Sequence, residues 1–292
     1  MNYRDLCRIL IDEESCILFL QQYKILPTQV TCDNGHQMAM NISKLIRWRC
    51  RKATCRIEKS IRQNTWLEGS KLSLEVICHF IYGWAFELTS IKFSQREFHM
   101  ANKTVIDWNN YLREVCNWRV QQNKILIGGV GLTVEIDESL FTRRKNNAGR
   151  ILPQQWMFGG ICRETKECFI VNVENRKAET LMPIIQRFIL PGTIIISDCW
   201  RAYKGIQSSG DHMHQTVNHQ HNFVDPDTGA HTQGIERMWR SVKFRNKKHS
   251  GTARDFMDSY LAEYMWRSRL KDRNPFTTIL EDIAAFWQSL KK

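Results

Sequence analysis

The sequence predicts an α/β fold, because runs of apolar, β-branched residues alternate with helical patterns through its second half. The strand-like runs end at Asp137 or span residues 155–162, 167–173 and 193–197. A helical pattern at 178–189 precedes the turn Pro191-Gly192, and another opens near Glu236. Three strands, a helix, a strand and a later helix are the order of a ribonuclease-H-like domain, which is a mixed sheet with helices on both sides.

Stretches of different character surround this α/β domain, which we place at residues 130–250. Residues 1–27 are predicted to form short amphipathic helices, and residues 28–70 hold cysteines among turn residues and short β-prone pieces. Residues 71–125 have helical periodicity, so they form either a helix-turn-helix DNA-binding region or an ordinary helical subdomain. Residues 251–292 are expected to form helices that pack on the α/β domain, the last of them capped by Asn274.

The chain is basic, with 42 Lys and Arg residues against 30 Asp and Glu residues and a net charge of +12. This excess favours nucleic acid as a partner, although a basic protein without a polyanionic partner can have the same composition. The basic residues concentrate in 44–62 and in 237–254, and the second stretch contains no acid. The candidate DNA contacts are Arg47, Arg49, Arg51, Lys52, Arg56, Arg62, Lys71, Lys103, Arg237, Arg240, Lys243, Lys247 and Lys248.

Membrane and secreted classes are disfavoured. The longest apolar stretch, 76–86, is interrupted by His79 and is too short to cross a bilayer. The N-terminus has no apolar region of the kind found in signal peptides. The ten cysteines are spread over the whole chain, which favours a reduced compartment over a disulfide-linked scaffold.

Three acids predict the chemistry of the α/β domain. Asp137 and Asp198 each end a strand-like run, and Glu236 lies at the start of an amphipathic helix. Carboxylates at two strand ends and on a packed helix can converge, and clustered oxygens are the ligands that Mg²⁺ and Mn²⁺ require. Two such ions support in-line phosphoryl transfer. The ordinary alternative is that these acids are solvated, or that Glu236 only meets the helix dipole. Glu135 and Glu138 are weaker candidates, because they are expected on the face of the strand opposite Asp137.

Several blocks of the chain resemble the Merlin superfamily of DNA transposases, which are eukaryotic relatives of a group of bacterial insertion-sequence transposases. The resemblance covers most of the chain, and its last catalytic block is quite specific. The blocks are Val134-Glu-Ile-Asp-Glu-Ser, Ser197-Asp-Cys-Trp-Arg-Ala-Tyr203 and Asp225-Pro-Asp-Thr-Gly-Ala-His-Thr-Gln-Gly-Ile-Glu-Arg-Met-Trp239, with Arg47-Trp-Arg-Cys-Arg, Ser60-Ile-Arg and Thr65-Trp-Leu-Glu-Gly-Ser-Lys71 upstream and Tyr264-Met-Trp-Arg267 downstream.

The resemblance implies a DDE triad carried by Asp137, Asp198 and Glu236, with two Mg²⁺ or Mn²⁺ ions. In that case Asp137 bridges both ions, and each of the other two acids holds one. It implies a cut-and-paste transposase that binds terminal inverted repeats and target DNA, acts as at least a homodimer on DNA, and works in the nucleus of a eukaryotic host. A domesticated DNA-binding protein without transposition activity and a structure-selective nuclease are the alternatives.

The same resemblance predicts a zinc ribbon within residues 28–70. Such ribbons use two Cys-x-x-Cys pairs, but Gly35 stands where the partner of Cys32 is expected, and the second pair is widened. The candidate zinc ligands are Cys32, His36, Cys50 and Cys55. The alternative is a ribbon-shaped module held by its core alone.

Histidines are concentrated before Glu236. Five of the nine lie within 20 residues, namely His212, His214, His219, His221 and His231. They form either a second metal site or, as we expect, a polar surface loop from which His231 is near enough to reach the acids.

Overall fold

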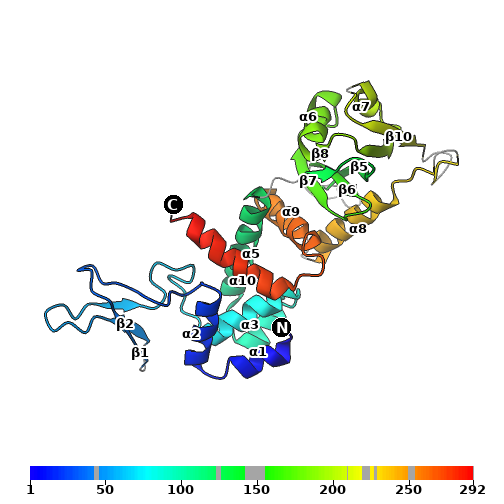
Figure 1. Cartoon of the computed structure of the whole chain (residues 1–292). Helices are drawn as coiled ribbons and strands as arrows, with labels where there is room; N and C mark the ends of the chain where they lie inside the picture. Colours follow the sequence, from blue (N-terminus) through cyan, green and yellow to red (C-terminus); the bar gives the residue numbers. More distant parts are fainter. Residues whose placement is uncertain are drawn as a thin grey trace. The chain divides into compact units, whose positions relative to one another are not determined.

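The protein divides into two compact units in this computed structural model (Figure 1), which describes residues 1–42, 46–122, 126–141, 155–208, 210–218, 224–226, 229–248 and 254–291. The terminal unit consists of Met1–Arg119 together with Asp272–Lys292, and the α/β unit consists of Val120–Lys271. No helix among the described residues has the length and apolar character needed to span a bilayer.

The terminal unit begins with two short helices, α1 (Tyr3–Ile9) and α2 (Glu13–Gln22). Asn2 caps the first, and Asp12 caps the second by accepting a hydrogen bond from the backbone N–H of Ser15. A three-stranded antiparallel sheet follows, in the order β1 (Ala39–Asn41), β2 (Arg47–Arg49) and β3 (Glu58–Ser60). Its strands are short, so the module has only a small core around Trp48.

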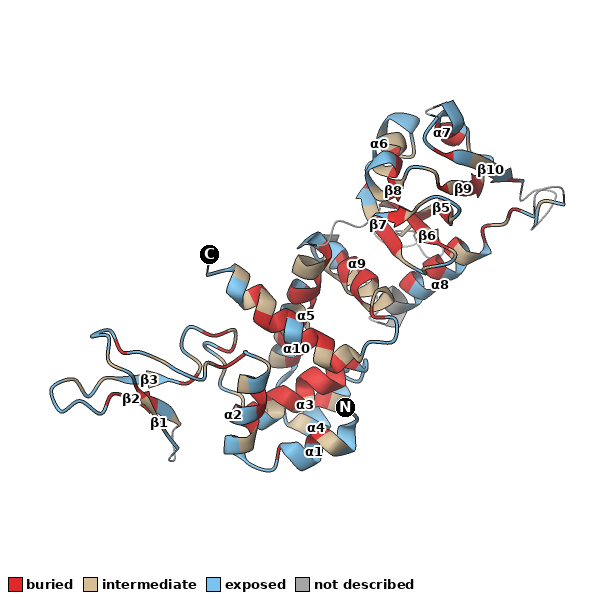
Figure 2. Ribbon diagram, in the orientation of Figure 1, coloured by how far each residue is buried: buried red, intermediate tan, exposed pale blue. Residues whose placement is uncertain are grey.

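Helix α3 (Leu74–Ala85) is the centre of the terminal unit, and it is buried along most of its length (Figure 2). It contacts α2, α4 (Ile91–Phe98) and α10 (Pro275–Ser289). Helix α5 (Asn102–Gln122) follows α4 after a three-residue turn in which His99 is left-handed. The region is therefore helical as expected, with 8 residues in α4 and 21 in α5.

The C-terminal helix differs from expectation, because residues 251–292 do not act as one group. Helix α9 (Arg254–Ser268) packs on strand β7 of the α/β unit, where Met265 lies against Ile170. Helix α10 belongs to the terminal unit, and its Phe276 stacks on Phe19 and meets the edge of Tyr82. The helix and its Asn274 cap were predicted correctly, but the surface that covers the helix was not.

The α/β unit is built on a five-stranded mixed sheet with strand order β10-β9-β5-β6-β7. The strands are β5 (Thr133–Leu140), β6 (Trp156–Cys162), β7 (Cys168–Val173), β9 (Ile194–Asp198) and β10 (Met213–Val217). Strand β6 runs antiparallel to its neighbours β5 and β7, whereas β9 and β10 run parallel to β5. This order and these directions are those of the ribonuclease-H-like fold, which confirms the predicted class.

Helices cover both faces of this sheet. One face packs against α6 (Ala178–Phe188), the 3₁₀ turn η1 (Arg201–Lys204) and α7 (Gly205–Ser208), around a core that includes Phe158, Phe169 and Tyr203. The other face packs against α8 (Gln233–Lys248) and α9. A small parallel pair, β4 (Ile127–Gly128) and β8 (Ile189–Leu190), lies beside the sheet.

Candidate active site

Asp137 and Asp198 lie side by side on neighbouring strands. Strands β5 and β9 are parallel, with Glu135 opposite Ile196, and two more residues in the same register put Asp137 next to Asp198. The two carboxylates are close enough for their charges to interact. Residues two apart on a strand share a face, so both point to the side on which Glu135 meets α8.

The third acid, Glu236, lies in the first turn of α8. Trp239 and Lys243 follow it by three and seven residues and therefore lie on the same face of the helix. Both interact with Asp137, Trp239 through its side chain and Lys243 through its charge. The face of α8 that carries Glu236 is thus turned toward the two aspartates.

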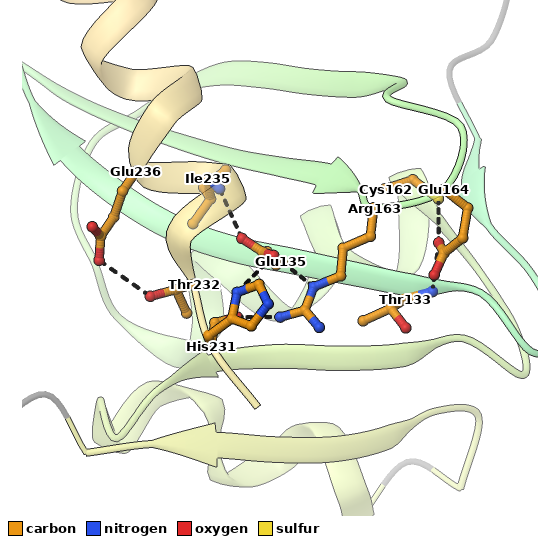
Figure 3. A network of polar contacts seen from close by, with 9 residues as sticks. All are labelled: Thr133, Glu135, Cys162, Arg163, Glu164, His231, Thr232, Ile235 and Glu236. Atoms are coloured by element: carbon orange, nitrogen blue, oxygen red, sulfur yellow. Dashed lines mark hydrogen bonds and ion pairs between the residues drawn. The ribbon is translucent and has the colours of Figure 1, made fainter. Parts of the chain in front are cut away.

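The three carboxylates have not gathered into a ligand cluster. Among the described residues, their carboxylate oxygens do not form a group in which all candidate ligand atoms lie within 4.8 Å of one another. The four predicted zinc ligands, which include Cys32, do form such a group. The Glu236 carboxylate accepts a hydrogen bond from the Thr232 hydroxyl, with 3.3 Å between Oγ1 and Oε1 (Figure 3). The side chain of Glu236 must leave Thr232 to join the aspartates.

The electrostatics around Asp137 favour a cation. Burial raises the pKa of Asp137 to about 7, and the charges of Glu138 and Asp198 act in the same direction. Burial also raises the pKa of Glu138, whose Oε1 has no hydrogen-bond partner of normal geometry among the described residues. A divalent cation would compensate these charges, and an all-oxygen ligand set suits Mg²⁺ or Mn²⁺. The residues present therefore fit such a metal.

One cation beside the acids was missed in the sequence. The guanidinium of Arg176 lies between two indoles, 4.1 Å from the ring centre of Trp156 and 4.6 Å from that of Trp200. Trp200 connects it to Asp198, because its backbone N–H donates to Asp198 Oδ1 at 2.9 Å and its indole N–H donates to the Arg176 carbonyl at 3.1 Å. Trp200 is in the same motif as Asp198, but only the tertiary fold brings Arg176 to it.

Most of the predicted DNA contacts are exposed. In the terminal unit these are Arg47, Arg49, Arg51, Lys52, Arg56, Lys71 and Lys103, and on α8 they are Arg237, Arg240 and Lys243. Arg47 and Arg49 share Glu58 as an ion-pair partner. The side chains of Lys247 and Lys248 lie outside the described residues.

The assignment of Arg62 as a DNA contact is corrected by the structure. Its guanidinium donates to the backbone carbonyls of Ser70, at 2.6 Å, and of Leu72, at 2.5 Å. Burial lowers the pKa of Arg62, although the residue stays charged at physiological pH. Because two of its donors hold the chain inside the terminal unit, this arginine supports structure instead of presenting a free charge to DNA.

The four predicted zinc ligands do gather. The ligand atoms of Cys32, His36, Cys50 and Cys55 all lie within 4.8 Å of one another. The Cys32 and Cys55 sulfurs are 3.6 Å apart, as are the Cys50 sulfur and His36 Nδ1. Tetrahedral zinc with ordinary bond lengths has edges of about 3.6–3.8 Å, so both distances fit. A hydrogen bond from the backbone N–H of Ile57, with a further one from His36, lowers the pKa of Cys55 to about 6, which favours the thiolate that binds zinc.

The histidines are dispersed. His214 lies on β10, with Nε2 2.9 Å from the Ser197 hydroxyl, and His212 is buried just before that strand. His231 has Nδ1 3.6 Å from Glu135 Oε1. His219 and His221 lie outside the described residues. The expected polar surface loop is therefore wrong for His212, which is buried, and for His214, which lies in a strand. Among the described residues, none of the histidines of the α/β unit joins a metal-binding group.

Comparison with known proteins bears on the α/β unit. Residues 129–269 match the ISXO2-like transposase domain family. This chain is also 27% identical, over 115 residues, to an uncharacterized transposase-like protein of Haemophilus influenzae; the match covers 39% of this chain and 91% of that protein. The two matches together support a DDE transposase.

Solved structures share low identity with this chain. The catalytic core domain of BIV integrase is 14% identical with a TM-score of 0.33, and the match covers 53% of this chain and 98% of that one. The chain in the Mos1 strand transfer complex is 8% identical with a TM-score of 0.26, covering 72% of this chain and 76% of that one. At these values, the assignment of the α/β unit to the ribonuclease-H-like fold rests on its strand order.

Proposed function

We propose that this chain is a DDE transposase that cuts DNA at the ends of its element and joins those ends to target DNA. The observation that carries the proposal is the placement of Asp137 beside Asp198 on parallel strands, facing the helix that bears Glu236. The family match over residues 129–269 supports the same chemistry. The resemblance of the motif blocks favours the Merlin superfamily and, in a eukaryotic host, a nuclear location.

Asp137, Asp198 and Glu236 would hold the divalent ions. When bound, these ions activate the attacking oxygen and stabilise the leaving oxygen of an in-line displacement at phosphorus. The protein orients the acids, because strand register fixes Asp137 against Asp198 and α8 brings Glu236 to the same face. Lys243, whose charge acts on Asp137, lies where it can contact a DNA phosphate.

Arg176 is a further candidate for a phosphate contact. Its two indole neighbours restrict the guanidinium to one plane, so a phosphate can bind without a further loss of side-chain freedom. The guanidinium makes no hydrogen bond or ion pair of its own among the described residues, although its charge acts on Glu138.

The terminal unit would recognise the terminal inverted repeats, with the Cys32, His36, Cys50 and Cys55 module holding zinc and α3 to α5 serving as a helix-turn-helix. Because two DNA ends must be processed together, we propose a homodimer or larger assembly on DNA.

The test is an excision and integration assay with the full chain. The substrate is a plasmid carrying the genomic DNA that flanks this reading frame, incubated with Mg²⁺ or Mn²⁺. We expect wild-type protein to release the element and join it to a target, and Asp137→Asn to bind the same DNA without cutting it. Retained cutting by Asp137→Asn would refute the assignment. Cutting without joined product would indicate a nuclease, and binding without cutting by the wild type would indicate a DNA-binding regulator.

A further inference from the structure

Glu135 lies two residues before Asp137 on β5, yet its carboxylate is used in a different way. Its side chain is 1% exposed, and its Oε1 is 2.6 Å from Nε of Arg163, which follows the end of β6 (Figure 3). Arg163 also donates to the backbone carbonyl of His231. A buried carboxylate held by a guanidinium in this way has little freedom to move toward a metal.

The second oxygen of Glu135 is bonded to the start of α8. Glu135 Oε2 accepts a hydrogen bond from the backbone N–H of Ile235 at 2.8 Å, where the helix dipole also favours a negative charge. The neighbouring glycine permits this contact: a Cβ on Gly234 would lie 2.8 Å from the same oxygen. The helix can therefore approach the carboxylate only because residue 234 has no side chain.

These contacts connect two of the proposed metal ligands by short rigid paths. Asp137 is two residues from Glu135 along a paired strand, and Glu236 is one residue from Ile235 along the helix. Functional groups must be held to within about 0.5 Å of their working positions. The link from β5 to α8 through Glu135 fixes the backbone of Glu236 relative to Asp137.

We infer that Glu135 and Arg163 form a clamp that sets the position of Glu236 and thereby the affinity of the site for divalent metal. Glu135 is thus a positioning residue that acts through α8, and it is not itself a metal ligand. This inference rests on the proposed function, because it assumes that Glu236 binds metal. A clamp of this kind differs from a stability contact, because its loss changes how much metal is needed.

The clamp is tested by measuring DNA cleavage by the full chain at increasing Mg²⁺ concentration. Glu135→Gln keeps the size of the side chain and an oxygen for the Ile235 N–H, but it loses the ion pair with Arg163. Gly234→Ala is the steric counterpart, since it pushes the helix away from an intact carboxylate. Glu164→Gln is the matched control, because Glu164 is an exposed neighbour that accepts hydrogen bonds from Thr133 and Cys162 (Figure 3). Among the described residues it makes no hydrogen bond or ion pair with α8.

We expect the half-saturating Mg²⁺ concentration to rise at least about tenfold in Glu135→Gln and Gly234→Ala, with cleavage largely recovered at saturating metal. The half-saturating Mg²⁺ concentration of Glu164→Gln should stay within about twofold of the wild-type value, well below the change expected when a contact that orients a metal ligand is lost. Titration of each full-length variant with Mn²⁺ in the absence of DNA should show the same order of affinities, which gives a readout that does not need cleavage.

Two results would overturn the clamp. One is an unchanged half-saturating metal concentration in a folded Glu135→Gln, even with a lowered melting temperature, because a stability role alone has that signature. The other is a loss of cleavage that saturating metal does not restore, because that would make Glu135 a catalytic group. Should Glu135→Gln not fold, the same criteria apply to Gly234→Ala. Failure of the proposed function gives a different result. In that case wild-type protein does not cleave DNA, or Asp137→Asn cleaves it as well as wild type does.

Discussion

Gly159 on β6 lies directly opposite Asp137 on β5, and the space beside it is filled by α8. A Cβ on Gly159 would be 3.0 Å from atoms of both Met238 and Trp239. The absence of a side chain at this position lets the helix that carries Glu236 approach the sheet where the two aspartates meet.

Gly159→Ala is predicted to lower both stability and activity, because the added methyl group must displace α8. Overpacking of this kind costs about 1–3 kcal/mol. Thermal unfolding and plasmid cleavage measure the two effects. Gly205→Ala is the control, since a Cβ there would only touch Met182 at 3.6 Å, an ordinary contact. Equal effects of the two substitutions would show that α8 tolerates displacement.

The stability of the metal-free protein should depend on the protonation of Asp137. Its folded-state pKa, about 7, is above the unfolded value of 3.8, so its contribution to stability is present below about pH 4 and is lost as the pH rises through 7. In EDTA, the melting temperature of wild type should fall between pH 5 and pH 8 relative to that of Asp137→Asn.

Divalent metal should reverse this effect where Asp137 is deprotonated. Mn²⁺ is expected to raise the melting temperature of wild type strongly at pH 8 and weakly at pH 5, because protons compete with metal for the carboxylate. Asp137→Asn should respond weakly at both values. Parallel pH profiles for the two proteins would contradict the raised pKa.

Zinc removal should unfold the module of residues 28–70 and abolish specific DNA binding. We expect one zinc per chain by elemental analysis, lost in Cys50→Ser because Cys50 is buried within the ligand group. Cys7→Ser, at an exposed cysteine outside the group, should keep its zinc. A Cys50→Ser protein that binds the element's ends with wild-type affinity would show that the ribbon is held by its core alone.

Arg176→Lys is predicted to weaken DNA binding, although the charge is kept. Lysine cannot lie flat between Trp156 and Trp200 or offer two parallel donors to a phosphate. The dissociation constant for DNA should rise several-fold when it is measured over a range of salt concentrations. The binding free energy lost should be comparable to that of one good phosphate contact. Arg187→Lys is the control, because Arg187 is exposed on α6. Equal affinities for the two variants would exclude Arg176 from the DNA interface.

The sequence predicted four of the five strands, because their residues are largely apolar or β-branched and buried, and Asp137 and Asp198 were identified from these runs. The polar edge strand β10 was not predicted, and Asp137 lies within β5, which continues to Leu140, and not at its end as expected. The different role of Glu135 could not be predicted. It was expected on the face opposite Asp137, which was wrong, because residues two apart on a strand share a face. Only the contact with Ile235 distinguishes its use from that of Asp137. Strand periodicity indicates which way a side chain points but does not specify its partner.

The same limit explains the C-terminal helix. The structure buries Phe276, Ile279 and Ile283, whose spacing places them on one face of the helix. That spacing does not encode whether α3 or the sheet provides the matching surface. Arg62 was likewise predicted to contact DNA because it lies in a basic stretch of the chain. In the structure its guanidinium instead donates to two backbone carbonyls, eight and ten residues later.

Both ends of the chain contribute to the terminal unit, so the α/β unit is an insertion within it. Arg119, the last residue of the first segment, pairs with Asp282 on α10, which brings the two segments together. A gene copy that loses its middle but rejoins these segments in frame would keep every element of the terminal unit, whereas a copy cut short by an early stop codon would lack α10. If the chain is the transposase proposed above, internally deleted copies of its element would compete for the ends of the element and limit the spread of intact copies.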